Sequence, residues 1–126
     1  MKHEARVFRS LADETRLSIL CLLMQHEELC VCDFMEVLGI TQSKASRHLR
    51  YLYNTGWVSD RREGLKIKYR LCTHSDTMKE KQLQTLAEVM NSHPIAQSLK
   101  GKLCHWLERK PKTGDGKEDG QTGVRT

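Results

Sequence analysis

The stretch from Thr41 to Leu71 reads TQSKASRHLRYLYNTGWVSDRREGLKIKYRL. Its first half predicts a helix over residues 42–54, because apolar side chains recur there at helical spacing. Thr41 is a good N-cap for this helix, and Gly56 is a good stop signal just beyond its end. The face opposite the apolar stripe carries short polar and basic side chains, as expected of a helix that lies against a polar partner.

The second half of the stretch predicts a β-hairpin. Residues 66–71 alternate between Lys or Arg and an apolar side chain, which is typical of a half-buried strand. Trp57 and Val58 lead into the partner strand, and Glu63-Gly64 lies between the two strands as the tip of the hairpin. A helix with a polar outer face followed by a basic hairpin is the order of a winged helix-turn-helix.

The residues before Thr41 predict the helices that complete this fold. A short amphipathic segment covers residues 4–10, and Asp13 is a good N-cap for a second helix. A third helix is expected from about Cys30 to Leu38, and Gly39 is a good stop at its end. The predicted fold class is therefore α+β, mostly α, with a winged helix-turn-helix and a two-stranded wing.

Two further helical segments are expected after His74, separated by His93-Pro94. Their apolar stripes, and that of the first helix, exceed what a small DNA-binding core needs, so we expect a helical, two-fold dimer interface. Such a homodimer places two recognition helices about one DNA turn apart. The DNA-binding and dimerisation domain is predicted to span residues 1–109. Residues 110–126, with four glycines and one apolar residue, predict a disordered tail.

Charge is distributed unevenly along the chain. The net charge is +5 over 126 residues, but residues 42–70 hold eight basic and two acidic side chains. Residues 1–41 hold four basic and seven acidic ones. Positive charge gathered in one segment is typical of a protein that binds a polyanion such as DNA.

The chain has neither a signal-peptide pattern at its start nor an apolar run of membrane-spanning length, so we expect a cytoplasmic protein with no membrane partner. Its five cysteines are then expected to be reduced thiols and not a disulfide framework.

The candidate DNA contacts lie on the polar face of the 42–54 helix and on the hairpin, where side chains reach base edges and phosphates of double-stranded operator DNA. On the helix they are Gln42, Ser43, Lys44, Ser46, Arg47, His48 and Arg50, and on the hairpin Arg61, Arg62, Lys66 and Lys68. We interpret Arg47, Arg61 and Lys66 as phosphate contacts. His48 projects toward the flank of its helix, where packing and DNA contact are both compatible with the pattern.

Two cysteines stand close together in the sequence ELCVCDFME, which runs from Glu28 to Glu36. A helix N-terminus lowers the pKa of a thiol, and thiolates select soft ions, so Cys30 and Cys32 are candidate ligands of a metal or metalloid. Residues two apart on a helix point about 200° apart around its axis. Because both cysteines are predicted to lie at the start of the helix, one ion cannot hold both sulfurs while this first turn stays helical, and we therefore expect ion binding to unwind the helix start.

Three motifs together, ELCVCD, TQSKASRHL and KIKYRL, resemble the arsenical-resistance operon repressors of the ArsR/SmtB family. The resemblance covers roughly Phe8 to Met90. It implies a dimeric repressor that leaves its own operon's promoter when trivalent arsenic or antimony binds Cys30 and Cys32. Some relatives carry a third cysteine three places after the second, where this chain has Met35.

Trivalent arsenic favours three sulfur ligands, and the sequence leaves the third one open. The candidates are Cys21, Cys72, Cys104 and an external thiol or hydroxide.

Other classes of function each require particular residues, which can be looked for in the sequence. A zinc-sensing relative is expected to carry Asp-x-His and a later His-x-x-His or His-x-x-Glu, but Asp76 is followed by Met78 two places on, and His93 by Ala96 three places on. A thiol-redox sensor that uses the same cysteine pair stays open. An enzyme is not expected, because the chain has no Cys-x-x-Cys and no evident pair of nucleophile and base. The basic hairpin argues against a pure dimerisation module.

Overall fold

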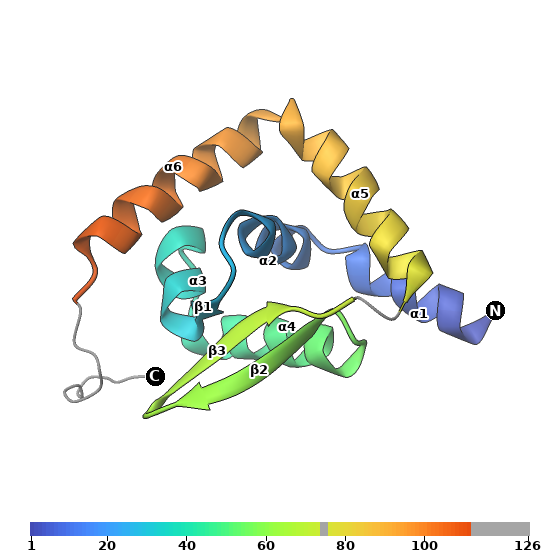
Figure 1. Cartoon of the computed structure of the whole chain (residues 1–126), viewed down its shortest axis with the longest axis horizontal. Coiled ribbons are helices and arrows are strands. Elements are labelled where there is room, and N and C mark those ends of the chain that lie inside the picture. Colours follow the sequence, from blue (N-terminus) through green and yellow to red (C-terminus); the bar gives the residue numbers. More distant parts are fainter. Residues whose placement is uncertain (74–75, 112–126) are drawn as a thin grey trace.

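The computed structural model describes residues 1–73 and 76–111, in which a small antiparallel sheet lies at one side of a group of helices (Figure 1). The elements in chain order are α1 (Lys2–Leu11), α2 (Glu14–Gln25), β1 (Leu29–Cys30), α3 (Val31–Leu38), α4 (Gln42–Asn54), β2 (Val58–Glu63), β3 (Lys66–Leu71), α5 (Thr77–Asn91) and α6 (Pro94–Arg109). This is a winged helix-turn-helix, and it confirms the predicted fold class.

Local capping chemistry sets the helix boundaries. The Asp13 side chain accepts a hydrogen bond from the Arg16 N–H at the start of α2, and Thr41 accepts one from the Lys44 N–H at the start of α4. Gly39 ends α3 with a φ of 66°, a left-handed conformation that glycine adopts without strain. The predicted caps at all three positions are confirmed.

The sheet has the strand order β1-β3-β2, and all pairs are antiparallel. In the hairpin, Val58 pairs with Leu71 and Glu63 pairs with Lys66, as the predicted wing requires. The structure adds the two-residue strand β1 at the free edge of β3, where Cys30 lies opposite Lys68. Cys30 is therefore a strand residue and the N-cap of α3, whereas the sequence predicted that it begins the helix.

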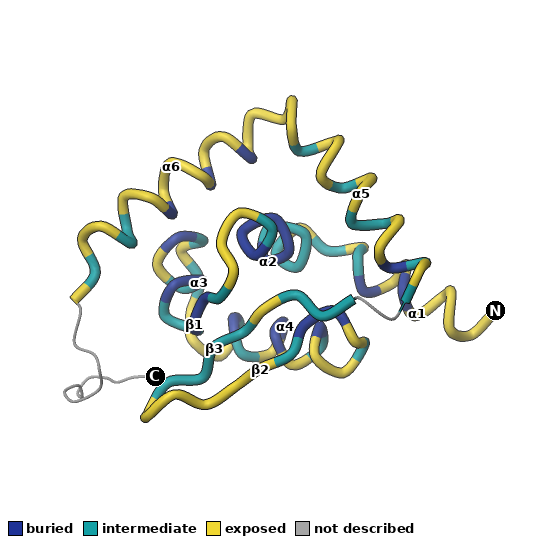
Figure 2. Tube along the Cα trace, in the orientation of Figure 1, coloured by how far each residue is buried: buried dark blue, intermediate teal, exposed yellow. Residues whose placement is uncertain are grey.

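The core lies between α2, α3, α4 and the sheet, and the inner faces of α5 and α6 close it (Figure 2). Trp57, fully buried where α4 gives way to β2, donates its indole N–H to Ser10 Oγ at 2.7 Å. Ser10 Oγ in turn donates to the Val7 carbonyl at 2.6 Å. These two hydrogen bonds give the buried Ser10 hydroxyl and the buried Trp57 indole N–H their partners, and they hold α1 against the start of the wing.

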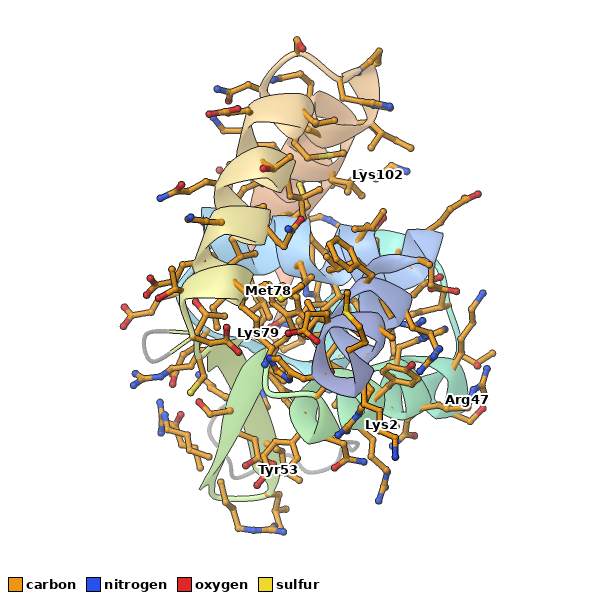
Figure 3. The ribbon with its side chains drawn as sticks, turned by 90° about the vertical axis from the view of Figure 1, so that its right-hand side faces the viewer. Lys2, Arg47, Tyr53, Met78, Lys79 and Lys102 are labelled. Atoms are coloured by element: carbon orange, nitrogen blue, oxygen red, sulfur yellow. The ribbon has the colours of Figure 1, made fainter. Side chains whose placement is uncertain are left out.

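The first turn of α5 is also fixed to this part of the core (Figure 3). Lys79 is buried, and its Nζ lies 3.1 Å from Asp76 Oδ2 and 5.9 Å from the centre of the Trp57 ring. Gly56, with a φ of 83°, passes so close that a Cβ there would lie 3.0 Å from Lys79 Nζ. A side chain at position 56 would therefore be strained and would displace the ammonium group.

Helices α5 and α6 form an arch over α2 and α3, with its apex at the predicted break His93-Pro94 (Figure 1). Helix α4 and the hairpin lie on the opposite side of the molecule. Within 1–73 and 76–111, no helix combines the length and the apolar character needed to cross a bilayer. Lys110, which the prediction assigned to the tail, is the C-cap of α6, and residues 112–126 of that predicted tail lie outside the described residues.

Candidate thiolate site and DNA-binding surface

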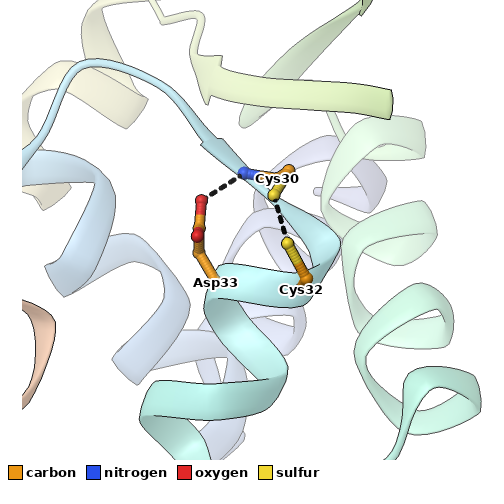
Figure 4. A group of neighbouring side chains, drawn as sticks. All are labelled: Cys30, Cys32 and Asp33. Atoms are coloured by element: carbon orange, nitrogen blue, oxygen red, sulfur yellow. Dashed lines mark hydrogen bonds between the residues drawn. The ribbon is translucent and has the colours of Figure 1, made fainter. Parts of the chain in front are cut away.

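The two cysteines of the ELCVCD motif meet at the junction of β1 and α3. Cys30 has an extended backbone, with φ −95° and ψ 169°, whereas Cys32 lies in the first turn of α3. The two Sγ atoms are 2.7 Å apart (Figure 4). The expectation that the helix start must unwind before both sulfurs meet is wrong, because only one of the two residues is helical. An extended residue followed by a helical turn brings the two sulfurs together in the folded chain.

Asp33 forms hydrogen bonds that hold this junction in place. It is only 3% exposed, and its Oδ2 accepts a hydrogen bond from the Cys30 N–H at 2.8 Å. Its Oδ1 accepts from Trp106 Nε1 at 2.8 Å and from Lys110 Nζ at 2.7 Å. The sequence interpretation did not single out these three residues. A carboxylate three positions after an N-cap is a capping-box signal that points to the first bond, but no local pattern points to the partners on α6.

The two thiols differ in acidity because they share one hydrogen bond. The bond to Cys32 raises the pKa of the Cys30 thiol, and burial of Cys30 adds to the increase. The same bond from Cys30 is the main reason that the pKa of Cys32 falls to about 7; burial and the Asp33 charge oppose this decrease, and the charges of Lys110 and Lys66 contribute to it. Near neutral pH a large fraction of Cys32 is therefore thiolate, which accepts a hydrogen bond from the Cys30 thiol.

The site offers two sulfur ligands from one chain. In the described part of the chain, Cys30, Cys32 and Asp33 form the one group of three metal-ligand side chains, with ligand atoms within 4.8 Å of one another. Both oxygens of Asp33 already accept hydrogen bonds, so its carboxylate is engaged. The remaining cysteines lie elsewhere: Cys21 is buried beside Gln25 in α2, Cys72 follows β3, and Cys104 is exposed on α6.

Helix α4 and the hairpin share the face opposite the α5 and α6 arch (Figure 1). Four candidate side chains on α4 are exposed, Gln42, Ser43, Arg47 and Arg50, and two are partly exposed, Lys44 and Ser46. Arg47 extends away from the body of the molecule (Figure 3). These six side chains form one polar and basic surface on a single helix.

His48 is the exception among the α4 candidates, with only 9% of its surface exposed. Its Nδ1 lies 3.2 Å from Arg16 Nη1 and 3.8 Å from Asp13 Oδ2, at the start of α2. Burial lowers the pKa of His48, since it removes the imidazolium from water. The structure therefore places His48 in the contact between α4 and α2, and not with the exposed set.

The basic side chains of the hairpin fall into two groups. Arg61 donates from Nε and Nη2 to both carboxylate oxygens of Glu28 at 2.7 Å, and from Nη2 to Glu63 at 3.2 Å. Lys68 Nζ lies 3.3 Å from Glu63. Within residues 1–73 and 76–111, no acidic side chain forms a salt bridge with Arg62 or Lys66. Two of the four predicted DNA contacts on the hairpin, Arg61 and Lys68, thus form salt bridges within the chain.

The chain is similar to known regulatory proteins. Residues 13–60 match the family model described as bacterial regulatory protein, arsR family. Over 69 residues the chain is 48% identical to the arsenical resistance operon repressor of Escherichia coli K12, covering 55% of this chain and 59% of that protein. The chain thus spans little more than half the length of this curated relative, so the similarity covers only part of it.

Two solved structures are similar over a larger share of their length. Reduced HlyU from Vibrio cholerae superimposes with a TM-score of 0.61 at 30% identity, covering 70% of this chain and 88% of that chain. The other is a homodimeric winged helix-turn-helix DNA-binding domain from Mycobacterium bovis, a possible ArsR-family transcriptional regulator. It superimposes with a TM-score of 0.59 at 33% identity, covering 69% of this chain and 80% of that chain.

Proposed function

Because the chain belongs to the ArsR family of bacterial regulatory proteins, we propose that it is a transcriptional repressor released from operator DNA by trivalent arsenic or antimony at Cys30 and Cys32. It acts in the cytoplasm as a homodimer. The observation that carries this proposal is the pair of sulfurs 2.7 Å apart beside the wing, that of Cys30 buried and that of Cys32 partly exposed. The similarity to an arsenical resistance operon repressor supports the choice of ion.

The donor set fits a soft, thiophilic ion. Two thiol groups face each other, and the lowered pKa of Cys32 supplies thiolate at neutral pH. Trivalent arsenic and antimony form strong bonds to sulfur, which is the chemistry this pair offers. The described cysteines of one chain provide no third sulfur at this place, so the third thiolate comes from outside the chain, from a small-molecule thiol or a second copy.

The DNA-binding surface works through position and charge. The exposed side chains of α4 enter the major groove, and the hairpin lies along the neighbouring backbone. Basic side chains there neutralise phosphates and release counterions, which provides affinity without sequence information. Two copies related by a two-fold axis present two such surfaces to a palindromic operator.

The thiolate site is connected to the DNA-binding surface through two contacts. Cys30 pairs with Lys68 on β3, so a backbone change at Cys30 acts on the wing through the β1 and β3 ladder. Helix α3 also packs against α4. An ion that binds more tightly to an arrangement of these contacts other than the DNA-bound one weakens DNA binding, and by reciprocity DNA weakens ion binding by the same factor.

The test separates DNA binding from ion response. Cys30→Ser and Cys32→Ser are each expected to bind the upstream DNA as tightly as the wild type, because neither side chain lies on α4. Fluorescence anisotropy should show that arsenite releases the wild type and the control Cys21→Ala, whose thiol is buried beside Gln25, but neither of the two variants. The proposal fails if Cys72→Ser or Cys104→Ser abolishes release while Cys30→Ser and Cys32→Ser keep it.

A thiol-redox repressor is the second candidate, and the facing sulfurs favour it as well. Hydrogen peroxide can oxidise the two thiols to a disulfide, because it takes up the two protons and two electrons that they lose and becomes two molecules of water. Titration of the reduced protein with arsenite and, separately, with peroxide distinguishes the two sensors. A zinc-type sensor is less compatible with this site, since zinc prefers four ligands and the Asp33 carboxylate is already engaged.

A further inference from the structure

We infer that Asp33 is a positioning residue for the cysteine pair, and that Trp106 and Lys110 at the end of α6 hold it in place. The end of α6 then determines how tightly an ion binds at Cys30 and Cys32. This inference rests on the proposed function of the cysteine pair and extends it to the end of α6, where Lys110 lies 77 residues beyond Asp33.

The hydrogen bonds of Asp33 leave its carboxylate little freedom. One oxygen receives the Cys30 N–H at 2.8 Å, and the other receives the Trp106 indole N–H and the Lys110 ammonium group. Because the group is 3% exposed, a rotation breaks at least one bond that water cannot replace. The orientation of the Cys30 backbone, and with it the position of the Cys30 sulfur, therefore depends on the two donors from α6.

A direct role of Asp33 as ligand is disfavoured by the same contacts. Bonds from an ammonium group and an indole to a buried carboxylate are charge-assisted and strong, and an ion would have to displace them. A soft ion also gains more from sulfur than from a carboxylate oxygen. Asp33 thus fits the role of an outer partner that orients a ligand, as hydrogen-bonded carboxylates do at metal sites.

The two donors move together, because both belong to the end of α6. The Lys110 N–H donates to the Trp106 carbonyl at 2.7 Å, which closes the last turn of the helix. Helix α6 packs along α3 but lies on the side of the molecule away from α4 and the hairpin (Figure 1). The Lys110 side chain therefore contacts the support of the cysteine pair and does not itself lie on the DNA-binding surface.

The experiment compares two lysines on the same terminal segment. Lys110→Gln removes the cation that holds Asp33. The control Lys102→Gln removes the same charge from an exposed position on α6 (Figure 3). Among residues 1–73 and 76–111, no side chain or carbonyl accepts a hydrogen bond from the Lys102 ammonium group. Loss of an outer partner costs about 10- to 100-fold in affinity at metal sites. We expect calorimetric titration with sodium arsenite to show a loss of at least about tenfold for Lys110→Gln, with Lys102→Gln unchanged and Lys110→Arg near the wild type.

A spectroscopic readout separates positioning from general destabilisation. Trp57 and Trp106 are the two tryptophans of the chain, and the Trp106 indole donates to Asp33. Arsenite should change the fluorescence of the wild type and of Lys102→Gln, and Lys110→Gln, which keeps Trp106, should need at least about tenfold more arsenite for the same change. Thermal unfolding checks that each variant is folded.

The inference is overturned if Lys110→Gln and Trp106→Phe, both folded, bind arsenite as tightly as Lys102→Gln does. It is overturned together with the proposed function if the reduced wild-type protein binds no arsenite.

Discussion

Arg61 illustrates at the residue scale how a side chain predicted to contact DNA is held by the rest of the chain. Its guanidinium group forms a two-pronged pair with Glu28, and Glu28 directly precedes the strand that carries Cys30. The side chain of Glu28 is 18% exposed, whereas that of Arg61 is 51% exposed. A phosphate that approaches Arg61 therefore competes with a carboxylate that is already in place.

Removal of this competitor is expected to strengthen DNA binding. Glu28→Gln frees Arg61 to neutralise one more phosphate, so the slope of log affinity against log salt should steepen by about 0.9. Titrations of upstream DNA at several salt concentrations measure this slope. Glu27→Gln is the matched control, because it removes the same charge one position away. The same gain in the background of Arg61→Gln would contradict the explanation.

The shared hydrogen bond of the cysteine pair predicts a pH dependence of thiol reactivity. Since thiolate is the reactive form, alkylation of Cys32 by iodoacetamide should rise with pH around a midpoint of about 7. In Cys30→Ala the lost hydrogen bond should move this midpoint upward. Peptide mass spectrometry at a series of pH values gives the rate for each cysteine. An unchanged midpoint in Cys30→Ala would show that Cys30 does not stabilise the thiolate.

At the scale of elements, the sequence predicted those boundaries that depend on local chemistry. Asp13 and Thr41 cap their helices with their own side chains, and Gly39 ends α3 through its own backbone conformation. Strand β1 was missed because two residues carry no periodicity and the strand exists only beside β3. Because β1 was missed, Cys30 was predicted to be helical, and its sulfur was predicted to point away from that of Cys32.

Local sequence patterns could not identify the residues that hold Asp33, because these residues too are neighbours only in the folded chain. Trp106 and Lys110 reach Asp33 across 73 and 77 residues, a distance over which spacing carries no information. His48 shows the intermediate case, since the helical projection placed it at the flank of α4 but did not identify Arg16 as its neighbour.

Arg16 connects three elements, and its loss is expected to destabilise the fold. Its Nε donates to the Ser10 carbonyl at 2.7 Å, Nη1 lies beside His48, and its guanidinium carbon is 4.1 Å from the centre of the Tyr51 ring. Arg16→Met should lower the free energy of unfolding by about 1–3 kcal/mol, since it leaves a carbonyl without its donor and removes the contact with the ring.

Urea denaturation measures this loss. Arg9→Met, at an exposed position on α1, is expected to change stability by less than about 0.5 kcal/mol. Equal losses in the two variants would mean that Arg16 has no special role in joining α1, α2 and α4.

At the scale of the whole molecule, the arch of α5 and α6 buries only its inner face. Its outer face is mostly exposed (Figure 2), and Val89 and Ile95 near the apex are about half exposed, as is Phe8 on α1. Exposed large apolar side chains on helices outside the DNA-binding surface suit contact with a second copy of the chain. A palindromic operator needs that copy, because one winged helix reaches only one half-site.

The predicted dimer gives the final test at this scale. Val89→Glu and Ile95→Glu place a charge where an apolar contact is expected, and burying an unpaired charge is costly, so each should shift the protein toward monomer. Sedimentation equilibrium measures the shift, and Leu65→Glu, at the exposed tip of the hairpin, should leave the dimer intact. A monomer neutralises about half as many phosphates, so the salt dependence of its DNA binding should fall to about half of the wild-type slope. If both variants remain dimeric at micromolar concentration, the two-fold contact lies elsewhere on the surface.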